Sequence, residues 1–423
     1  MRHPVARLLY QVGVALTLLG AGPFLLASKG RHYLATLTGR LGGGSAPDPT
    51  PRLWLHAVSV GEVAVAATLA RALPPELPLL VTTVTPTGQE RARVAFSQQR
   101  AAIAYLPFDL GFALRRFLGR FRPTALVLVE GDYWPLLLAR LAERDLPIVV
   151  VNGRVSDRSF GRLAALAGRW PRLLDAFFAP VARFGMQTGE DARRLEALGV
   201  PAERVRVTGN LKYETTAPAD QPDLLSLVRR LAAGRPVLVA GSTMAGEEEA
   251  VLGAFRRAGG GGRALLVLAP RHPERFAEVE RLVARSGLAA ARRSGSPAAA
   301  DLEVLLLDTL GELAALYALA EVAFIGGTLV PKGGHNPLEA ARFGVPVVVG
   351  PSMENFREIA DAFDHARAWR RVADAAELAT AFDQLLGEPA AARELGARGA
   401  GLIEANRGAL TRTLEMLGPW LAT

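Results

Sequence analysis

The stretch FIGGTLVPKGGHNPLEAARFGVPVVVGP, residues 324–351, contains the pattern that indicates the fold class. An apolar run leads into a glycine-rich turn, a short helical segment follows, and Gly-Val-Pro opens a second apolar run. Buried parallel strands appear in sequence as continuous apolar runs, and a helix is the usual crossover between two of them. The stretch therefore predicts one strand, turn, helix and strand unit of a doubly wound α/β domain.

The turn of this unit is also a candidate binding site. Asn336 suits a helix N-cap, Pro337 suits the first helical position, and Glu339 falls in the first turn. Free N–H groups at such a helix start suit a phosphate, and Glu339 can accept hydrogen bonds from ribose hydroxyls. Lys332 adds a compact positive charge near the phosphate. The alternative is a capping-box-like helix start that binds no ligand.

Similar alternation of apolar runs and helical segments covers most of the chain. One series, after a Gly/Pro-rich link, consists of RLWLHAVS, PLLVTTVT, AAIAYLP, ALVLVEG, PIVVVNG, AFFAPVA and VRVTGN, and a later one of PVLVAGS, ALLVLAP, EVLLLD, VAFIGG and VPVVVG. A polar stretch at residues 214–223 separates them. We expect two Rossmann-like domains, residues 41–213 and 214–423, that face a central cleft, because ligands of open parallel sheets bind beyond the carboxyl ends of the strands.

Three charged residues of the first domain are candidates for catalysis. Glu62 lies at a strand-to-helix turn, where the positive end of the helix favours the carboxylate form that a general base needs. Glu130 ends a strand together with Asp132, and Lys212 lies at the domain junction. The alternatives are a capping box between Ser59 and Glu62, a solvated strand end, and an exposed linker lysine. Lysine is rare here, at three of the 49 basic positions.

Weaker candidates follow other strands of the second domain. The turns GSTMAGEEE and LAPRHPERF offer Ser242, Thr243 and Arg271 to an anion, and the turn DTLGEL offers Gly311 and Glu312. The histidines beside these loops have a spacing that matches no metal site, and the chain contains no Asp-x-Asp motif. We therefore expect neither a divalent-metal sugar-nucleotide site nor another cofactor.

Composition narrows the function classes further. The 423-residue chain is 50% hydrophobic, which is enough for cores of ordinary size, and its formal net charge of +8 favours anionic partners. It has no cysteine, which excludes thiolate catalysis, disulfides and Cys-ligated zinc.

The amino-terminal segment predicts attachment to a membrane. Residues 8–27 carry no charge and would measure about 30 Å as a helix, which is close to the thickness of the hydrocarbon layer. Basic residues flank the segment and suit anionic headgroups: Arg2, Arg7, Lys29, Arg31 and Arg40. We expect residues 1–40 to form an anchor that leaves the rest of the chain in the cytoplasm. A cleaved signal peptide and a buried helix are the alternatives.

Taken together, the motifs resemble those of the Kdo transferases of lipopolysaccharide assembly in order and spacing. The resemblance covers nearly the whole chain and rests on HAVSVGE, TPTGQE, LPFDL, VEGDYWP, VNGRVS, GNLKYE, GSTMAGEEE, APRHPERF, DTLGEL and GGTLVPKGGHNPLEA. It implies the two-domain GT-B glycosyltransferase fold with an amino-terminal anchor at the cytoplasmic face of the bacterial inner membrane. It also implies inverting transfer of 3-deoxy-D-manno-octulosonic acid (Kdo) from CMP-Kdo to a lipid A precursor, lipid IVA, with no nucleic-acid partner.

The resemblance also assigns residues to roles. It makes Glu62 the proton acceptor, and Glu130 and Lys212 the residues that stabilise the transition state. Its CMP-binding segments match Pro270, Arg271, Leu310, Gly311, Glu312, Asn336, Pro337, Leu338 and Glu339. The carboxylate and phosphate of the donor are anionic, so cations and helix starts can stabilise departure of CMP without a metal.

Two departures from the family pattern concern the donor and the acceptor. Met244 stands where relatives usually have a histidine, and residues 131–136 read Gly-Asp-Tyr-Trp-Pro-Leu instead of Thr-Glu-Leu-Trp-Pro-Asn. Two other function classes share the two-domain architecture: nucleotide-sugar 2-epimerases, which need no anchor, and two-lobed periplasmic binding proteins, which perform no catalysis.

Overall fold

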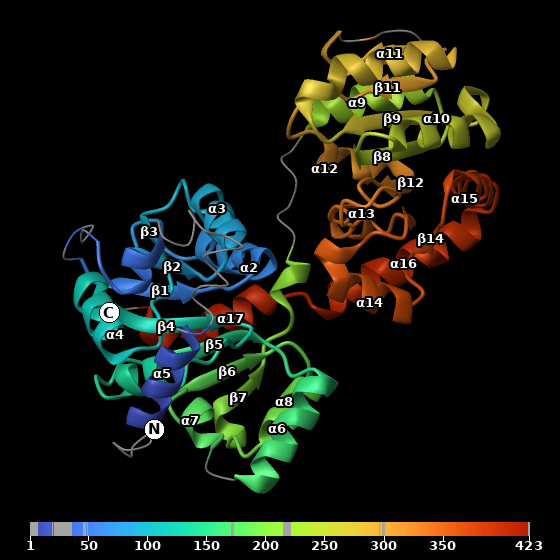
Figure 1. Cartoon of the computed structure of the whole chain (residues 1–423). Helices are drawn as coiled ribbons and strands as arrows, with labels where there is room; N and C mark the ends of the chain where they lie inside the picture. Colours follow the sequence, from blue (N-terminus) through green and yellow to red (C-terminus); the bar gives the residue numbers. More distant parts are fainter. Residues whose placement is uncertain are drawn as a thin grey trace. The chain divides into compact units, whose positions relative to one another are not determined.

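A computed structural model describes residues 7–18, 20, 36–44, 48, 50–170, 173–214, 221–295, 297 and 301–421. The chain forms two compact units, residues Met1–Glu214 with Asn406–Thr423, and residues Thr215–Ala405. Over the described residues, each unit contains a seven-stranded sheet in which all strand pairs are parallel (Figure 1). The prediction of two parallel-sheet α/β domains is confirmed.

The sheet of the first unit has the order β3-β2-β1-β4-β5-β6-β7. Its strands are β1 (Arg52–His56), β2 (Leu79–Thr83), β3 (Ala101–Tyr105), β4 (Pro123–Val129), β5 (Ile148–Gly153), β6 (Arg183–Met186) and β7 (Val205–Val207). The chain runs outward from β1 to β3 and then crosses back to β4 on the other side of β1. Ligands of doubly wound sheets bind at such a reversal, beyond the carboxyl ends of the two strands.

Helices cover both faces of this sheet because side chains alternate along its buried strands. Trp54 of β1 packs in a core with α4 (Gly111–Phe121), α5 (Pro135–Ala142), α7 (Asp175–Phe178) and α8 (Gly189–Ala197). Leu53 and Leu55 point into the opposite core, beneath α2 (Val60–Arg71), α3 (Pro86–Ala95) and α17 (Ala409–Leu417). Helix α6 (Asp157–Arg169) lies against the first of these cores through partly buried side chains.

The carboxyl-terminal helix departs from the expected domain boundaries. Sequence analysis assigned residues 214–423 to the second domain, whereas Asn406–Thr423 belong to the first unit. Ala409, Met416 and Leu417 of α17 are buried in its core, and Nε of Arg412 donates to the carbonyl of Thr208 at 2.9 Å. An apolar helix face needs a core to cover it, but its periodicity does not say which of two cores that is.

The second unit has the sheet order β10-β11-β9-β8-β12-β13-β14. Its strands are β8 (Val237–Thr243), β9 (Leu265–Pro270), β10 (Ala290–Arg292), β11 (Val304–Leu306), β12 (Ala320–Ile325), β13 (Val347–Val349) and β14 (Arg370–Arg371). Its α-helices are α9 (Pro222–Ala232), α10 (Glu247–Arg257), α11 (Phe276–Ser286), α12 (Leu313–Leu316), α13 (Leu338–Ala341), α14 (Arg357–His365), α15 (Ala375–Gly387) and α16 (Pro389–Ala405). The direction of the sheet reverses between β8 and β12, and doubly wound sheets bind their ligands at reversals of this kind.

The amino-terminal segment is described in part. Residues 7–18 and 20 are helical. The expected apolar segment covers residues 8–27, and its residues 19 and 21–27 lie outside the described residues. Within the described part of the chain, no helix is long and apolar enough to cross a membrane.

The described parts of this segment contact the first unit. The hydroxyl of Tyr10 donates to Asp109 Oδ2 at 2.8 Å, and Gln11 Oε1 accepts from the N–H of Gly111 at 2.9 Å. Arg40 is buried and donates to the carbonyl of Val84 at 2.6 Å. Residues 1–40 were expected to lie outside both domains. Their described parts instead pack on the first unit, because polar side chains of the segment form hydrogen bonds with the unit's loops.

Candidate functional site

In the first unit, two candidate carboxylates flank the strand reversal. Glu62 lies in the first turn of α2, which follows β1, and Glu130 comes directly after β4. The capping box forms: the Ser59 hydroxyl accepts from the N–H of Glu62 at 3.2 Å, and Glu62 Oε2 accepts from the N–H of Val58 at 2.8 Å. Capping fixes the position of the Glu62 carboxylate and leaves its other oxygen for a further partner.

The surroundings of Glu62 strengthen it as a base. Burial raises the pKa of Glu62, and the negative charge of Glu130 raises it further. Hydrogen bonds from Val58 and Ser59 and the proximity of His56 oppose this effect, but the net shift is upward. A carboxylate with a raised pKa accepts a proton from a hydroxyl more readily than an ordinary glutamate does.

Glu130 and Lys212 meet in the structure although they are far apart in sequence. Lys212 Nζ lies 2.7 Å from Glu130 Oε1, and each side chain is about one fifth exposed, at 19% and 20%. Lys212 belongs to the short 3₁₀ turn η2 (Leu211–Tyr213) that follows β7. Glu130 has a left-handed backbone with φ of 63°, which is uncommon for a residue other than glycine and occurs often at functional sites.

A histidine, His56, lies at the same edge together with Asp132, the carboxylate that sequence analysis paired with Glu130. His56 Nε2 lies 3.2 Å from Asp132 Oδ2, and the indole N–H of Trp134 donates to the same oxygen at 2.7 Å. Although burial raises the pKa of Asp132, its contacts with His56 and Trp134 hold the pKa below its usual value. Sequence analysis considered the histidines only as metal ligands, and the position of His56 at the end of β1, the strand that precedes Glu62, was the signal that it did not use.

In the second unit, the candidate residues lie at the carboxyl ends of β8, β9 and β12. Ser242 and Thr243 end β8, Pro270 ends β9, and the N–H of Arg271 donates to the carbonyl of Thr243 at 2.9 Å. The hydroxyl of Thr243 is buried and has no hydrogen-bond partner among the described residues. A ligand group or a water molecule would supply the partner that a buried hydroxyl normally has.

The loop after β12 brings a histidine and a glutamate close to Arg271. His335 Nδ1 lies 2.8 Å from the carbonyl oxygen of Gly326, while burial and the positive charge of Arg271 lower the pKa of His335. Burial raises the pKa of Glu339, with Arg271 opposing the shift. Asn336 Oδ1 accepts from the N–H of Leu338 at 3.1 Å, and α13 begins one residue later than expected, at Leu338.

Glu247 holds this loop together, and sequence analysis gave it no role. Its buried carboxylate accepts from four backbone N–H groups at 2.6–2.9 Å, those of Met244, Gly327, Thr328 and Leu329. These N–H groups therefore already have a hydrogen-bond acceptor within the protein, the Glu247 carboxylate. The sequence Gly-Glu-Glu at a strand-to-helix turn was the available indication.

The remaining predicted residues differ in exposure. Lys332 is exposed in the loop after β12, and Leu310 and Gly311 are exposed after β11. Glu312 is engaged by the protein, accepting from the Thr309 hydroxyl and from Arg293 Nη2, the latter at 3.0 Å. Pro337 and Leu338 are buried, so their side chains face the interior of the second unit.

Comparison with known proteins identifies related chains. Residues 35–215 match the family model described as 3-deoxy-D-manno-octulosonic-acid transferase (kdotransferase). The chain is 35% identical to the 3-deoxy-D-manno-octulosonic acid transferase of Haemophilus influenzae, covering 94% of each chain. It is 38% identical to the enzyme of that name from Bordetella pertussis, covering 90% of each chain.

A solved structure also matches part of the chain. It is the C-terminal CMP-Kdo binding domain of WaaA from Acinetobacter baumannii, at 34% sequence identity and a TM-score of 0.40. The match covers 43% of this chain and 99% of that domain.

Proposed function

The chain belongs to the Kdo transferase family of glycosyltransferases, and from that premise we propose that it transfers Kdo from CMP-Kdo to a lipid A precursor, lipid IVA. Family membership favours this function over an epimerase or a binding protein. The structural observation that supports it best is Glu62, a base with a raised pKa, at the same strand reversal as the Glu130–Lys212 ion pair. The second unit supplies the donor site in this proposal.

The donor binds at the edge formed by β8, β9 and β12. Arg271 provides positive charge for the anionic donor, and the unpartnered hydroxyl of Thr243 provides a hydrogen bond. Glu339, held near Arg271, accepts from the ribose hydroxyls, because a carboxylate accepts two such bonds well. Ser242, Lys332 and the segments Leu310–Glu312 and Asn336–Leu338 complete the proposed donor contacts.

Glu62 acts as the general base in the transfer step. Its second carboxylate oxygen takes the proton from the acceptor's 6-hydroxyl group. The hydroxyl oxygen of the acceptor then attacks the anomeric carbon of Kdo. The bond from this carbon to the CMP phosphate breaks on the opposite side, and CMP leaves with the bonding electrons. A single displacement of this kind inverts the configuration at the anomeric carbon.

The Glu130–Lys212 pair stabilises charge during that displacement. Negative charge grows on the departing phosphate, and a partly buried ammonium stabilises it more than one in bulk water. Glu130 keeps the ammonium in place at a distance of 2.7 Å. Because a fixed cation and the donor-site arginine supply this charge, the proposed reaction needs no metal ion.

We also propose that the amino-terminal helix attaches the enzyme to the cytoplasmic face of the inner membrane. In the helix of residues 7–18, the side chains of Tyr10 and Gln11 form hydrogen bonds with the first unit. Large apolar side chains, between 46% and 67% exposed, occupy the helix positions that recur every three or four residues, namely Leu8, Leu9, Val12 and Leu16. A helix with one bound face and one exposed apolar face suits the boundary between headgroups and acyl chains. We therefore propose an interfacial anchor.

Incubation of the purified protein with CMP-Kdo and tetra-acylated lipid A precursor tests the function. Mass spectrometry of the extracted lipid should show addition of Kdo, together with release of CMP. An unchanged lipid mass, with CMP-Kdo left intact or hydrolysed, would contradict the proposal. A matched incubation with CMP-activated sialic acid controls for donor selectivity.

A further inference from the structure

We propose that Asn152 is a positioning residue that holds Glu130 and Lys212 in their reactive arrangement. The inference rests on the proposed function, because it assigns Asn152 a role through those two residues. Asn152 lies in β5, the strand next to β4, and it is fully buried.

The side chain of Asn152 links the two segments that carry the ion pair. Its Nδ2 donates to Glu130 Oε1 at 3.2 Å, and its Oδ1 accepts from the N–H of Leu211 at 2.8 Å. Leu211 immediately precedes Lys212 in the turn η2. Glu130 Oε1 therefore contacts both Asn152 Nδ2 and Lys212 Nζ, and one amide side chain fixes the carboxylate and the backbone next to the ammonium.

A closed ring of hydrogen bonds supports this link. Gln187 Nε2 donates to the carbonyl of Asn152 at 3.0 Å, and Asn210 Nδ2 donates to Gln187 Oε1 at 3.0 Å. In η2 the N–H of Lys212 donates to Asn210 Oδ1 at 2.9 Å. The ring closes through the neighbouring N–H of Leu211, which donates to Asn152. All three amide side chains are buried, so loss of any of them leaves unsatisfied polar groups.

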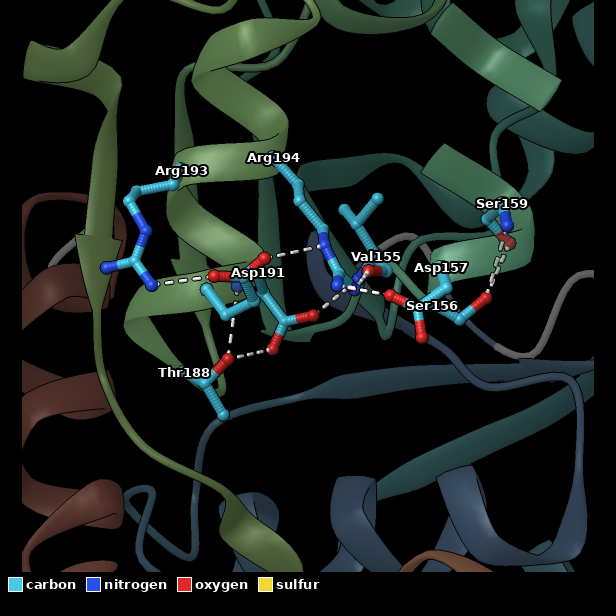
Figure 2. A network of polar contacts seen from close by, with 9 residues as sticks. Val155, Ser156, Asp157, Ser159, Thr188, Asp191, Arg193 and Arg194 are labelled. Atoms are coloured by element: carbon cyan, nitrogen blue, oxygen red, sulfur yellow. Dashed lines mark hydrogen bonds and ion pairs between the residues drawn. The ribbon is translucent and has the colours of Figure 1, made fainter. Parts of the chain in front are cut away.

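The backbone of Asn152 is held in an uncommon conformation. Its φ is 55°, in the left-handed region that asparagine tolerates better than most residues. The loop that follows is fastened to α8: Asp191 Oδ1 accepts from the N–H of Val155 at 2.8 Å, and Arg194 Nη1 donates to the carbonyl of Val155 at 2.8 Å (Figure 2). A conformation of this kind persists only where surrounding contacts enforce it, and at this position it aims the amide at Glu130.

The substitution Asn152→Gly removes the amide and keeps the left-handed backbone without strain. We expect kcat to fall about tenfold to hundredfold, because a small misplacement of reacting groups has effects of that size. The KM for CMP-Kdo should change less than about threefold, since the donor site lies on the other unit. Asp145→Gly is the matched control, because Asp145 also has a positive φ, of 54°, and is exposed.

Asn152→Asp tests the role even if the glycine variant does not fold. The new carboxylate can still accept from Leu211, but it donates to Glu130 only when it is protonated. The ionisable groups that face it are Glu130, directly after β4, and Lys212 on η2, and Glu62 of α2, with His56 of β1 beside it, interacts in turn with Glu130. We expect the rate of the Asp variant, divided by that of the parent, to rise as pH falls.

The outcomes separate this inference from the proposed function. The double variant Asn152→Gly with Glu130→Gln should be no more than about twofold slower than Glu130→Gln alone, because both act on one interaction. A glycine variant with the parent's kcat, an Asp variant with a pH-independent ratio, or fully multiplicative losses in the double variant would each overturn the inference. A parent protein that transfers no Kdo would instead overturn the proposed function.

Discussion

The ammonium of Lys212 and the carboxylate of Glu130 form an ion pair with an Nζ–Oε1 distance of 2.7 Å. The two groups come from separate segments of the first unit, one directly after β4 and the other after β7. Partial burial leaves both side chains about one fifth exposed, so the pair is only weakly screened by solvent. An ion pair of this kind at a strand reversal can supply the positive charge that phosphate departure requires.

Exchange of this lysine for arginine should slow the reaction. A guanidinium is planar and larger, and its forked donors do not match a site shaped for a compact ammonium. We expect Lys212→Arg to lower kcat at least about tenfold, or roughly 1.4 kcal/mol of transition-state stabilisation, with little change in unfolding temperature. Lys212→Ala should reduce it further. Arg206→Lys, an exposed basic exchange on β7, is the control, and a Lys212→Arg enzyme with the parent's turnover would disprove the assignment.

The rate should depend on pH through Glu62. Burial raises the pKa of Glu62, and only its deprotonated form can take the acceptor's proton. The value of kcat/KM should therefore increase with pH through that pKa, with a midpoint above the usual range of glutamate, about 4.3. The measurement is initial rate between about pH 4.5 and 8. Glu90→Gln, which removes an exposed carboxylate from α3, should leave the profile unchanged, whereas a flat or falling profile of the parent would refute the role of Glu62.

Parts of the fold and of the candidate site could be predicted from the sequence, and others could not. The apolar runs of β12 and β13, with the glycine-rich turn between them, indicated a parallel α/β domain because those strands are buried on both sides. Glu62 and Glu130 were found because each lies at the carboxyl-terminal end of a predicted strand or in the turn after it. The roles of Asn152 and Glu247 were not found, since each depends on hydrogen bonds to segments distant in sequence. For the same reason, sequence did not indicate that α17 packs on the first unit.

Glu247 should matter for donor binding although it need not touch the donor. In Glu247→Gln the amide nitrogen faces N–H donors instead of accepting from them, so about half of the four backbone bonds are lost. We expect destabilisation of the second unit by about 2–4 kcal/mol and at least tenfold weaker CMP binding, since the loop that leads to Glu339 loosens. Calorimetry and thermal unfolding measure the two effects. The exposed neighbour substitution Glu249→Gln is the control, and unchanged CMP affinity in Glu247→Gln would contradict this role.

The exposed face of the amino-terminal helix should control membrane binding. Substitution of Leu8, Leu9 and Leu16 by Gln removes apolar side chains that are at least 62% exposed, so folding should be unaffected. We expect at least about tenfold weaker binding to vesicles of phosphatidylethanolamine and phosphatidylglycerol, because each inserted leucine contributes about 1.5–3 kcal/mol when fully buried. Cosedimentation measures the change. Val94→Gln, a 64% exposed position on α3, is the control, and equal sedimentation of the triple variant and the parent would disprove the interfacial anchor.

The mass of the lipid product formed by the parent and by Glu62→Gln, side by side, is the most direct test of the proposed function. The amide keeps the shape of Glu62 and can still accept from the N–H of Val58, but it cannot take up a proton. We predict that the parent adds Kdo to the tetra-acylated precursor and that the variant adds none, while its CMP affinity stays within about threefold of the parent's. A parent that leaves the lipid mass unchanged, or a Gln variant that transfers Kdo at the parent's rate, would contradict the account.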